Sequence, residues 1–279
     1  MPTELINGIS IFYEEAGTGF PIVWAHEFAG DYRSWSKQVE FFVSRYRVIT
    51  YNARGYPPSS VPTNKNSYSL ENSVEDLKAL FDHLSIGQAH VGGLSMGGST
   101  VLNFGLRYPE RVRSIIVAGT GTGSTNPEIF RQDIQKYANS IMTDGMSAMK
   151  DYSQNENRRH LFIKHPDNWQ IFFDHFMEHS SVGSSLTFLG VQGKRAPVFE
   201  LEHKLKDLSV PTLIMVGDDD QPCIQPSLFM KNCIRNSGLV IFPKSGHAIN
   251  LEEPHLFNLT VERFLQLVES GKWEQITEL

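Results

Sequence analysis

The stretch HVGGLSMGG, residues 90–98, decides the fold, because it surrounds a single serine, Ser95, with four glycines. It lies between an apolar run typical of a buried strand and an apolar pattern typical of a helix. Gly93 to Gly97 fits the spacing G-x-S-x-G, a sharp strand-to-helix turn in which a strained serine is exposed and larger side chains two residues away would collide. A phosphate-binding loop is not indicated, because the pattern G-x-x-x-x-G-K-[ST] needs a lysine that is missing here.

Strands and helices alternate on both sides of Ser95. Asn7-Gly8 indicates a hairpin near the N-terminus. Short apolar runs predict buried strands at 21–26, 46–52, 89–94, 112–119, 211–217 and 238–243. Apolar residues at helical spacing predict helices at 34–44, 71–84, 95–108, after 217 to about residue 234, and at 254–268. Such alternation is typical of an α/β protein with a mostly parallel sheet.

Residues 121–205 interrupt this alternation. They are rich in helix formers, methionine and aromatic residues, and they contain no convincing strand. We therefore expect a core formed by residues 1–120 and 206–279 and a helical lid formed by residues 121–205. Aromatic side chains of the lid are expected either to pack on one another or to line a substrate pocket. The candidates for the pocket are Trp169, Phe172, Phe173 and Phe176.

The composition is that of an ordinary globular protein. Of the 279 residues, 40% are hydrophobic and 20% are charged, and the net charge is -6. No basic cluster suggests nucleic-acid binding, and no apolar stretch reaches the ~20 residues that span a bilayer. Two cysteines do not make a disulfide framework, and the N-terminus lacks the regions of a secretory signal. We expect a cytoplasmic protein without a nucleic-acid or membrane partner, and the oligomeric state stays open.

Partners for the serine follow it in the chain. A serine hydroxyl becomes a good nucleophile only when a base removes its proton, and the base needs an acid to orient it. Three consecutive aspartates, 218–220, follow one predicted strand, and His247 lies in the loop after the next. Because ligands of α/β sheets bind at the carboxyl ends of the strands, we expect Ser95, one aspartate and His247 to meet there.

The order serine, acid, histidine resembles the α/β-hydrolase family, and the resemblance covers the whole chain. It implies a mostly parallel eight-stranded sheet flanked by helices, with a helical lid inserted. Family members commonly place the acid three positions after a glycine here, which favours Asp220 after Gly217. The GLSMGG turn looks most similar to the lactonase and esterase branch, which includes enol-lactonases. Carbon–carbon bond hydrolases and cofactor-free perhydrolases are similar too, whereas dehalogenases carry aspartate where this chain has Ser95.

A carbonyl under attack becomes an oxyanion, which needs N–H donors already in place. Met96 N–H is one candidate, because it opens the helix that follows Ser95. The resemblance implies that the second donor follows a His-Gly pair after an earlier strand. That site reads WAHEFAG in this sequence, so Phe28 N–H is the second candidate.

Glu27 departs from the family, which usually has glycine at this position. An anion ~4 Å from the oxyanion would cost about 4 kcal/mol at an effective dielectric constant of about 20. Glu27 is therefore expected to point away, to be paired or to be protonated, and we predict an ion pair with Arg54 of YNARGYPPS. A structural role and a role in substrate binding both stay open for Glu27. The same loop has Asn52 where aspartate is common and Pro57-Pro58 where glycine often appears.

Among the ten histidines, only His247 lies where this chemistry needs one. His26 is expected to hydrogen-bond backbone beneath the oxyanion loop, and His90 to cap the start of a strand. His175 and His179 have a spacing that metal ligands use, but no HExxH motif or nearby acid pair supports a metal site, and lining the pocket is the alternative. Four others are expected at the surface: His160, His165, His203 and His255.

The sequence thus favours a serine hydrolase that cleaves a carboxylic ester or lactone without a cofactor. Ser95 would attack, His247 would carry the proton, Asp220 would orient the imidazole, and the two amides would hold the oxyanion. The aromatic lid favours a small, mainly apolar substrate. Two alternatives stay open: cleavage of a carbon–carbon bond next to a ketone by the same residues, and a small-molecule receptor that uses this fold for binding.

Overall fold

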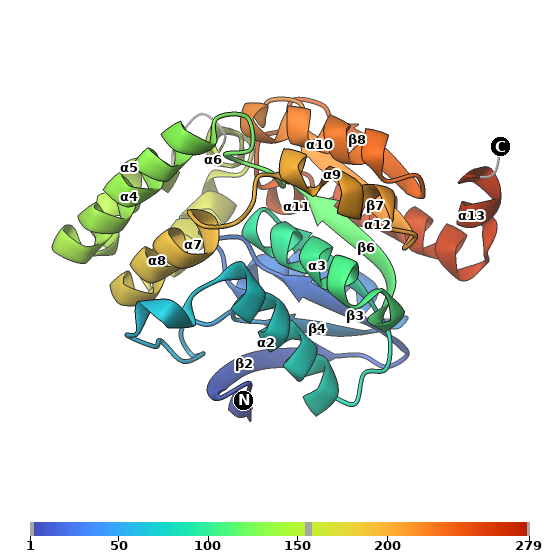
Figure 1. The fold of residues 1–279 in the computed structure, drawn as a ribbon, viewed down its shortest axis with the longest axis horizontal. Coiled ribbons are helices and arrows are strands. Elements are labelled where there is room, and N and C mark those ends of the chain that lie inside the picture. The colour runs from blue at the N-terminus through green and yellow to red at the C-terminus, as the bar shows by residue number, and fades with distance from the viewer. Residues whose placement is uncertain (1–2, 154–157, 278–279) are drawn as a thin grey trace.

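The structure is a computed structural model that describes residues 3–153 and 158–277. Its centre is one eight-stranded sheet with the strand order β1-β2-β4-β3-β5-β6-β7-β8 (Figure 1). β2 runs antiparallel to β1 and β4, and β3 to β8 run parallel. The expected mostly parallel eight-stranded sheet is confirmed. The strands are β1 Thr3–Ile6, β2 Ile9–Ala16, β3 Phe20–Ala25, β4 Tyr46–Tyr51, β5 Ala89–Leu94, β6 Val112–Ala118, β7 Thr212–Gly217 and β8 Ser237–Phe242.

The first two strands form a hairpin at the predicted Asn7-Gly8 turn. Asn7 has a φ of 50° and Gly8 a φ of 77°, the left-handed conformation that two-residue hairpin turns need. Ile6 consequently pairs with Ile9 across the turn.

Helices cover both faces of the sheet. One face packs against α2 (Leu70–His83), α3 (Met96–Arg107) and α10 (Gln221–Cys233), whose apolar side chains share one buried cluster with the sheet. The other face packs against α1 (Ser36–Phe42) and α12 (Pro254–Glu269) in a second cluster. These helices agree with the ranges predicted from apolar spacing. Two short helices were missed, α11 (Ile249–Glu252) and α13 (Lys272–Thr277), because one or two turns are too short for periodicity to show.

Residues 121–205, here called the helical segment, follow β6 and precede β7. Their described part contains helices and no strand. α4 to α8 lie together on one side of the molecule (Figure 1) and share a third buried cluster with loop residues that follow β3 and β4. The elements are α4 (Pro127–Asp144), η4 (Met146–Met149), α5 (Lys150–Ser153), α6 (Arg159–Lys164), α7 (Pro166–Met177), α8 (Ser181–Thr187), the π-helix η5 (Phe188–Gln192), η6 (Val198–Leu201) and α9 (Glu202–Lys206).

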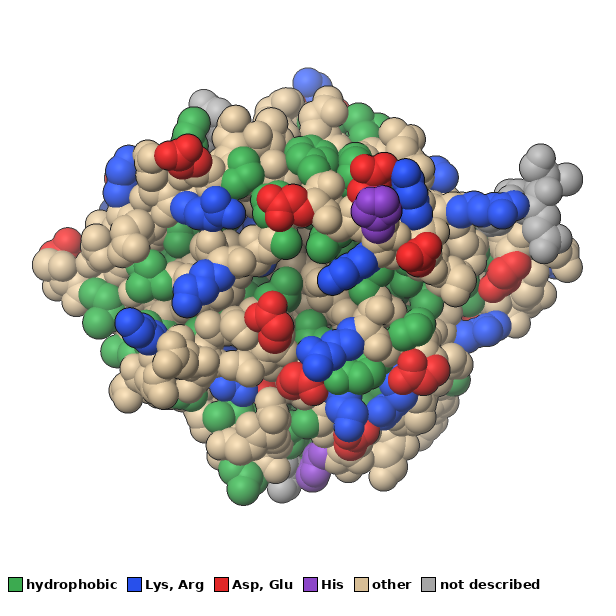
Figure 2. Space-filling view, in the orientation of Figure 1, with side chains coloured by type: hydrophobic (Ala, Val, Ile, Leu, Met, Phe, Trp, Pro, Cys, Tyr) green, Lys and Arg blue, Asp and Glu red, His purple; other side chains and the backbone are tan. Residues whose placement is uncertain are grey.

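The surface carries both signs of charge. On the face shown in Figure 2, basic and acidic side chains are interspersed, with apolar side chains between them. Within the described ranges, no helix is both long enough and apolar enough to pass through a bilayer.

Candidate active site

Ser95 occupies a strained turn between β5 and α3. Its φ is 55° and its ψ is -108°, a conformation that few residues other than glycine adopt. A Cβ at Gly97 would collide with the carbonyl group of Ala25, and a Cβ at Gly93 would collide with the backbone of Gly97. Glycine is therefore required on both sides of the serine, as the motif predicts.

The outer two glycines, Gly92 and Gly98, leave space for neighbouring side chains. A Cβ at Gly92 would overlap the ring of Trp24, and a Cβ at Gly98 would overlap the hydroxyl of Thr120. All four glycines thus permit a close approach, two at the turn itself and two where it packs on neighbouring strands.

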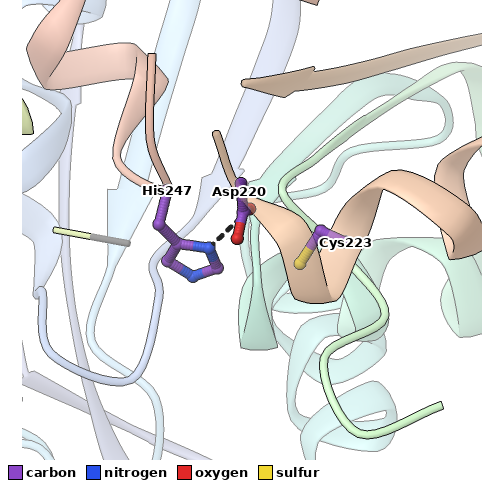
Figure 3. Close-up of side chains that lie close together, drawn as sticks. All are labelled: Asp220, Cys223 and His247. Carbon is purple, nitrogen blue, oxygen red and sulfur yellow. Dashed lines mark hydrogen bonds and ion pairs between the residues drawn. The ribbon is translucent and has the colours of Figure 1, made fainter. Parts of the chain in front are cut away.

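His247 and Asp220 form a buried hydrogen-bonded pair. His247 Nδ1 lies 2.8 Å from Asp220 Oδ2, and the two residues are 4% and 0% exposed (Figure 3). Asp220 ends the loop after β7 and is the residue before α10, while His247 lies in the loop after β8. The other two aspartates bond elsewhere, because Asp218 accepts from Ser245 N–H and Asp219 pairs with His160.

Cys223 lies beside this pair. One ligand atom from each of Asp220, Cys223 and His247 lies within 4.8 Å of the others. Burial raises the pKa of Cys223 well above its ordinary value, so the thiol stays protonated at neutral pH, and it contacts Gly119 O at 3.2 Å. Its contacts with Gly119 O and with Thr122 Oγ1, both at 3.2 Å, are those of a packed side chain.

Glu252 holds the loop that carries His247. Its two carboxylate oxygens accept from Gly246 N–H at 2.7 Å and from Ala248 N–H at 3.0 Å, the residues on either side of His247. The side chain is fully buried, and burial raises the pKa of Glu252 although both hydrogen bonds oppose this. Sequence reasoning missed this residue, because an acid after the histidine shows no periodicity or motif.

Ser95 and His247 line one cavity of about 160 Å³. Most of its wall comes from the helical segment, with aromatic rings from α4, α5 and η5 and two arginines. The described lining residues are Ser95, Thr122, Phe130, Asp133, Ile134, Tyr137, Tyr152, Arg158, Phe188, Gln192, Arg195 and His247.

The aromatic residues expected to line the pocket lie elsewhere. Among the described residues, the cavity wall includes none of Trp169, Phe172, Phe173 and Phe176. The Trp169 ring stacks on that of Phe173 at 5.1 Å, and the Phe176 ring meets that of Phe28 edge-on at 6.3 Å. The expected alternative, packing of lid aromatic residues on one another, describes Trp169 and Phe173, whereas Phe176 also packs against Phe28 in the turn after β3. The cavity takes its aromatic rings from Phe130, Tyr137, Tyr152 and Phe188 instead.

The two expected oxyanion donors are available. Neither Phe28 N–H, at the turn after β3, nor Met96 N–H, at the first position of α3, donates to another described residue. Tyr56 Oη donates to Phe28 O at 3.0 Å and so fixes the turn. His26 lies beneath it as predicted, with Nε2 accepting from Ala53 N–H and Nδ1 2.7 Å from Glu27 O. Burial lowers the pKa of His26, which favours the neutral ring that this arrangement needs.

Glu27 is paired, but with a different arginine from the one predicted. Arg54 bonds to Asp76 of α2 through Nε at 2.7 Å and Nη2 at 2.6 Å. Glu27 instead forms an ion pair with Arg158, the residue before α6, and both side chains are buried. The predicted Glu27–Arg54 pair is therefore wrong, since Asp76, on the inner face of α2, takes Arg54.

Four other histidines make contacts that hold the fold together. His90 lies inside β5, bonded to Ser114, and does not cap the strand. His179 packs against the rings of Tyr56 and Phe176, where burial lowers its pKa to about 3. His160 and His165 are half-buried contacts of α6 with the loops after β7 and β8, not free surface residues.

Comparisons with known proteins agree with the fold. Residues 21–145 match the family model of the alpha/beta hydrolase fold. The chain is 26% identical to a 3-oxoadipate enol-lactonase of Acinetobacter baylyi, covering 88% of each protein. It is 28% identical to a 2-hydroxy-6-oxononadienedioate/2-hydroxy-6-oxononatrienedioate hydrolase of Pseudomonas putida, covering 92% of each. A thermophilic esterase of Thermogutta terrifontis superposes with a TM-score of 0.84 at 27% identity, over 93% of this chain and 94% of that one. The expected resemblance to the α/β-hydrolase family, lactonases and esterases included, is confirmed.

Proposed function

We propose that this chain, which has the α/β-hydrolase fold, is a serine hydrolase that cleaves a carboxylic ester or lactone through an acyl-enzyme. One observation carries the proposal: Ser95 and His247 line the same cavity, and His247 is bonded to the buried Asp220. The similarity to an enol-lactonase and an esterase supports the same chemistry.

The reaction uses the free nitrogen of His247. A carboxylate can only accept a hydrogen bond, so Nδ1 carries the hydrogen that faces Asp220 and Nε2 is left to take a proton. Ser95 Oγ attacks the carbonyl carbon as its proton passes to Nε2, and the C=O oxygen becomes the oxyanion. Phe28 and Met96 N–H donate to that oxyanion. The alcohol leaves with the proton, and water then releases the acid by the same path.

The substrate is small and carries an anionic group. Arg195 lines the cavity, donates to Thr122 O at 2.7 Å and to Ser99 Oγ at 3.4 Å, lies over the Phe130 ring, and has no carboxylate partner among the described residues. Burial lowers the pKa of Arg195 to about 10, so the guanidinium remains charged at neutral pH. The aromatic walls suit an apolar body, but a half-buried guanidinium without a carboxylate partner among the described residues favours a carboxylate on the substrate. The mainly apolar substrate expected from the sequence is therefore narrowed to an ester or lactone that bears a carboxylate.

The helical segment acts as the lid of this site. It supplies every described wall residue of the cavity except Ser95 and His247. We place the boundary of the lid at residues 121–205, with residues 1–120 and 206–279 as the catalytic core.

A second candidate reaction is hydrolysis of a carbon–carbon bond next to a ketone. The similarity to the Pseudomonas putida hydrolase, over 92% of both chains, favours it. Ser95, Asp220 and His247 would take part in both reactions, so the two are distinguished by testing which substrates are cleaved.

A fluorophosphonate probe tests the nucleophile. Intact mass should show one adduct on the parent protein and none on Ser95→Ala. Ser73→Ala is the matched control, because Ser73 is 9% exposed and Ser95 is 8% exposed, and it should label like the parent. An adduct that persists on Ser95→Ala would remove the proposal.

A substrate panel then assigns the reaction. Esters and lactones should be offered in pairs with and without a carboxylate, together with vinylogous diketones. The carboxylated esters or lactones should be preferred, and Arg195→Met should lose that preference while it still cleaves the neutral members. Turnover of the diketones alone would favour carbon–carbon cleavage.

A further inference from the structure

The ion pair between Glu27 and Arg158 links the oxyanion turn to the helical segment. Glu27 directly precedes Phe28, the candidate oxyanion donor, and its side chain is 1% exposed. Arg158 is 131 residues away in the chain and lines the cavity that Ser95 and His247 share. The anionic member of the pair thus lies at the turn that holds the oxyanion, and the cationic member lies in the cavity wall.

Arg158 is the only described cation that pairs with Glu27. The other arginines near this turn have their own partners, since Arg33 pairs with Asp31 and Glu178 and Arg54 pairs with Asp76. Without Arg158, the Glu27 carboxylate would be a buried anion beside a site where negative charge develops, and charges in such surroundings are screened weakly.

The position of Arg158 is fixed by contacts of α6. His160 pairs with Asp219 at 2.9 Å, and Lys164 pairs with Glu253 at 2.6 Å. His165 Nε2 lies 3.0 Å from Glu252 O. These three contacts hold α6 against the loops that carry Asp220 and His247. Arg158 therefore reaches Glu27 when the helical segment is docked on the catalytic loops.

We propose that Arg158 is a positioning residue of the hydrolytic site, which acts by neutralising Glu27 so that the oxyanion can form beside it. The inference rests on the proposed serine hydrolase function. It gives the helical segment a part in catalysis besides covering the cavity, because Arg158, directly before α6, supplies the positive charge that balances Glu27 next to the oxyanion turn. Arg158 contacts Glu27 in this role and does not contact the reacting atoms.

The experiment uses probes without charge, 4-nitrophenyl acetate and a neutral fluorophosphonate, so that attraction of a substrate anion cannot explain the result. The variants are Arg158→Gln, Arg158→Lys, Glu27→Gln and the double variant Glu27→Gln/Arg158→Gln. Arg158→Gln should lower kcat about 100-fold with KM little changed, comparable with the loss of one oxyanion donor. Arg158→Lys keeps the charge and should retain most of the activity.

The double variant decides the matter. Glutamine at position 27 removes the unpaired anion, so the kcat of the double variant should lie within about fivefold of the kcat of Glu27→Gln alone. A double-mutant cycle measures this coupling between the two positions. The concentration of labelled Ser95 in each sample normalises kcat to folded enzyme. A double variant as slow as Arg158→Gln, or an Arg158→Gln variant with the kcat of the parent, overturns the proposal. If the parent protein itself is not labelled at Ser95, the hydrolase function fails instead, so the two failures are separate.

Discussion

Asp220 Oδ2 lies 2.8 Å from His247 Nδ1, across an interval of 27 residues that contains α10 and β8. The bond joins the ends of two neighbouring parallel strands, β7 and β8, so the sheet sets the separation of the two loops. It also fixes the hydrogen of the imidazole on the nitrogen away from the cavity.

Asp220→Asn should abolish most of the activity while the fold survives. The amide can donate to Nδ1, which places the hydrogen of the imidazole on Nε2, where it can no longer accept the serine proton. We expect kcat to fall by about 10⁴-fold with little change in the midpoint of urea unfolding. Asp219→Asn is the control, because Asp219 pairs with His160 and not with His247. Equal losses in both variants would contradict the assignment of Asp220.

Gly97→Ala should prevent formation of the serine turn. The added Cβ meets the carbonyl group of Ala25 and lies 2.7 Å from His26 O, and backbone at a strand end cannot move aside cheaply. We expect loss of fluorophosphonate labelling and a large drop in the melting temperature. Gly87→Ala provides the comparison, since nothing lies within 4 Å of its Cβ. Normal labelling of Gly97→Ala would show that the turn differs from this description.

Arg54→Met should cost stability and leave the reaction intact. The substitution leaves the buried Asp76 carboxylate without its cation, which lowers the free energy of unfolding by about 3–5 kcal/mol. The kcat per folded molecule should stay close to that of the parent, because Glu27 pairs with Arg158 and not with Arg54. Urea unfolding and active-site titration measure the two effects separately. Lys78→Met, which breaks an exposed pair with Asp82, should change stability little.

Glu252 should give the stability a specific pH dependence. Burial raises its pKa in the folded protein above the ordinary value of 4.5, so the folded state holds a proton that the unfolded chain releases first. The contribution of this group to the free energy of unfolding is then fully present below pH 4.5 and is lost as the pH rises through the folded pKa. Glu252→Gln should remove this change of the unfolding free energy with pH, which urea unfolding measures at a series of pH values from below 4.5 upward. Glu253→Gln should keep the slope, and a slope unchanged in Glu252→Gln would refute this assignment.

The placement of Ser95, Asp220 and His247 could be predicted because it depends on topology. Each residue follows a predicted buried strand, and parallel strands bring such positions to one edge of the sheet. The glycines around Ser95 could be interpreted for the same reason, since a strained turn has a short local signature.

Contacts made by side chains between distant segments could not be predicted. The stripe of apolar residues on α2 gives no sign that Asp76 on the same helix accepts Arg54, and nothing near position 158 indicates a partner at position 27. Phe172 and Phe176 are buried, but the sequence does not indicate whether their side of α7 meets the cavity or other parts of the protein. Such choices depend on how helices dock, which the spacing along one helix does not specify.

The pair formed by Glu27 and Arg158 limits how this protein can be re-engineered. A chimera that grafts another protein's segment onto residues 121–205 would discard Arg158 and keep Glu27. Such a hybrid needs glycine or glutamine at position 27 as well. If residues 121–205 of this protein are instead placed on the core of another protein, that core needs a glutamate at the position equivalent to 27.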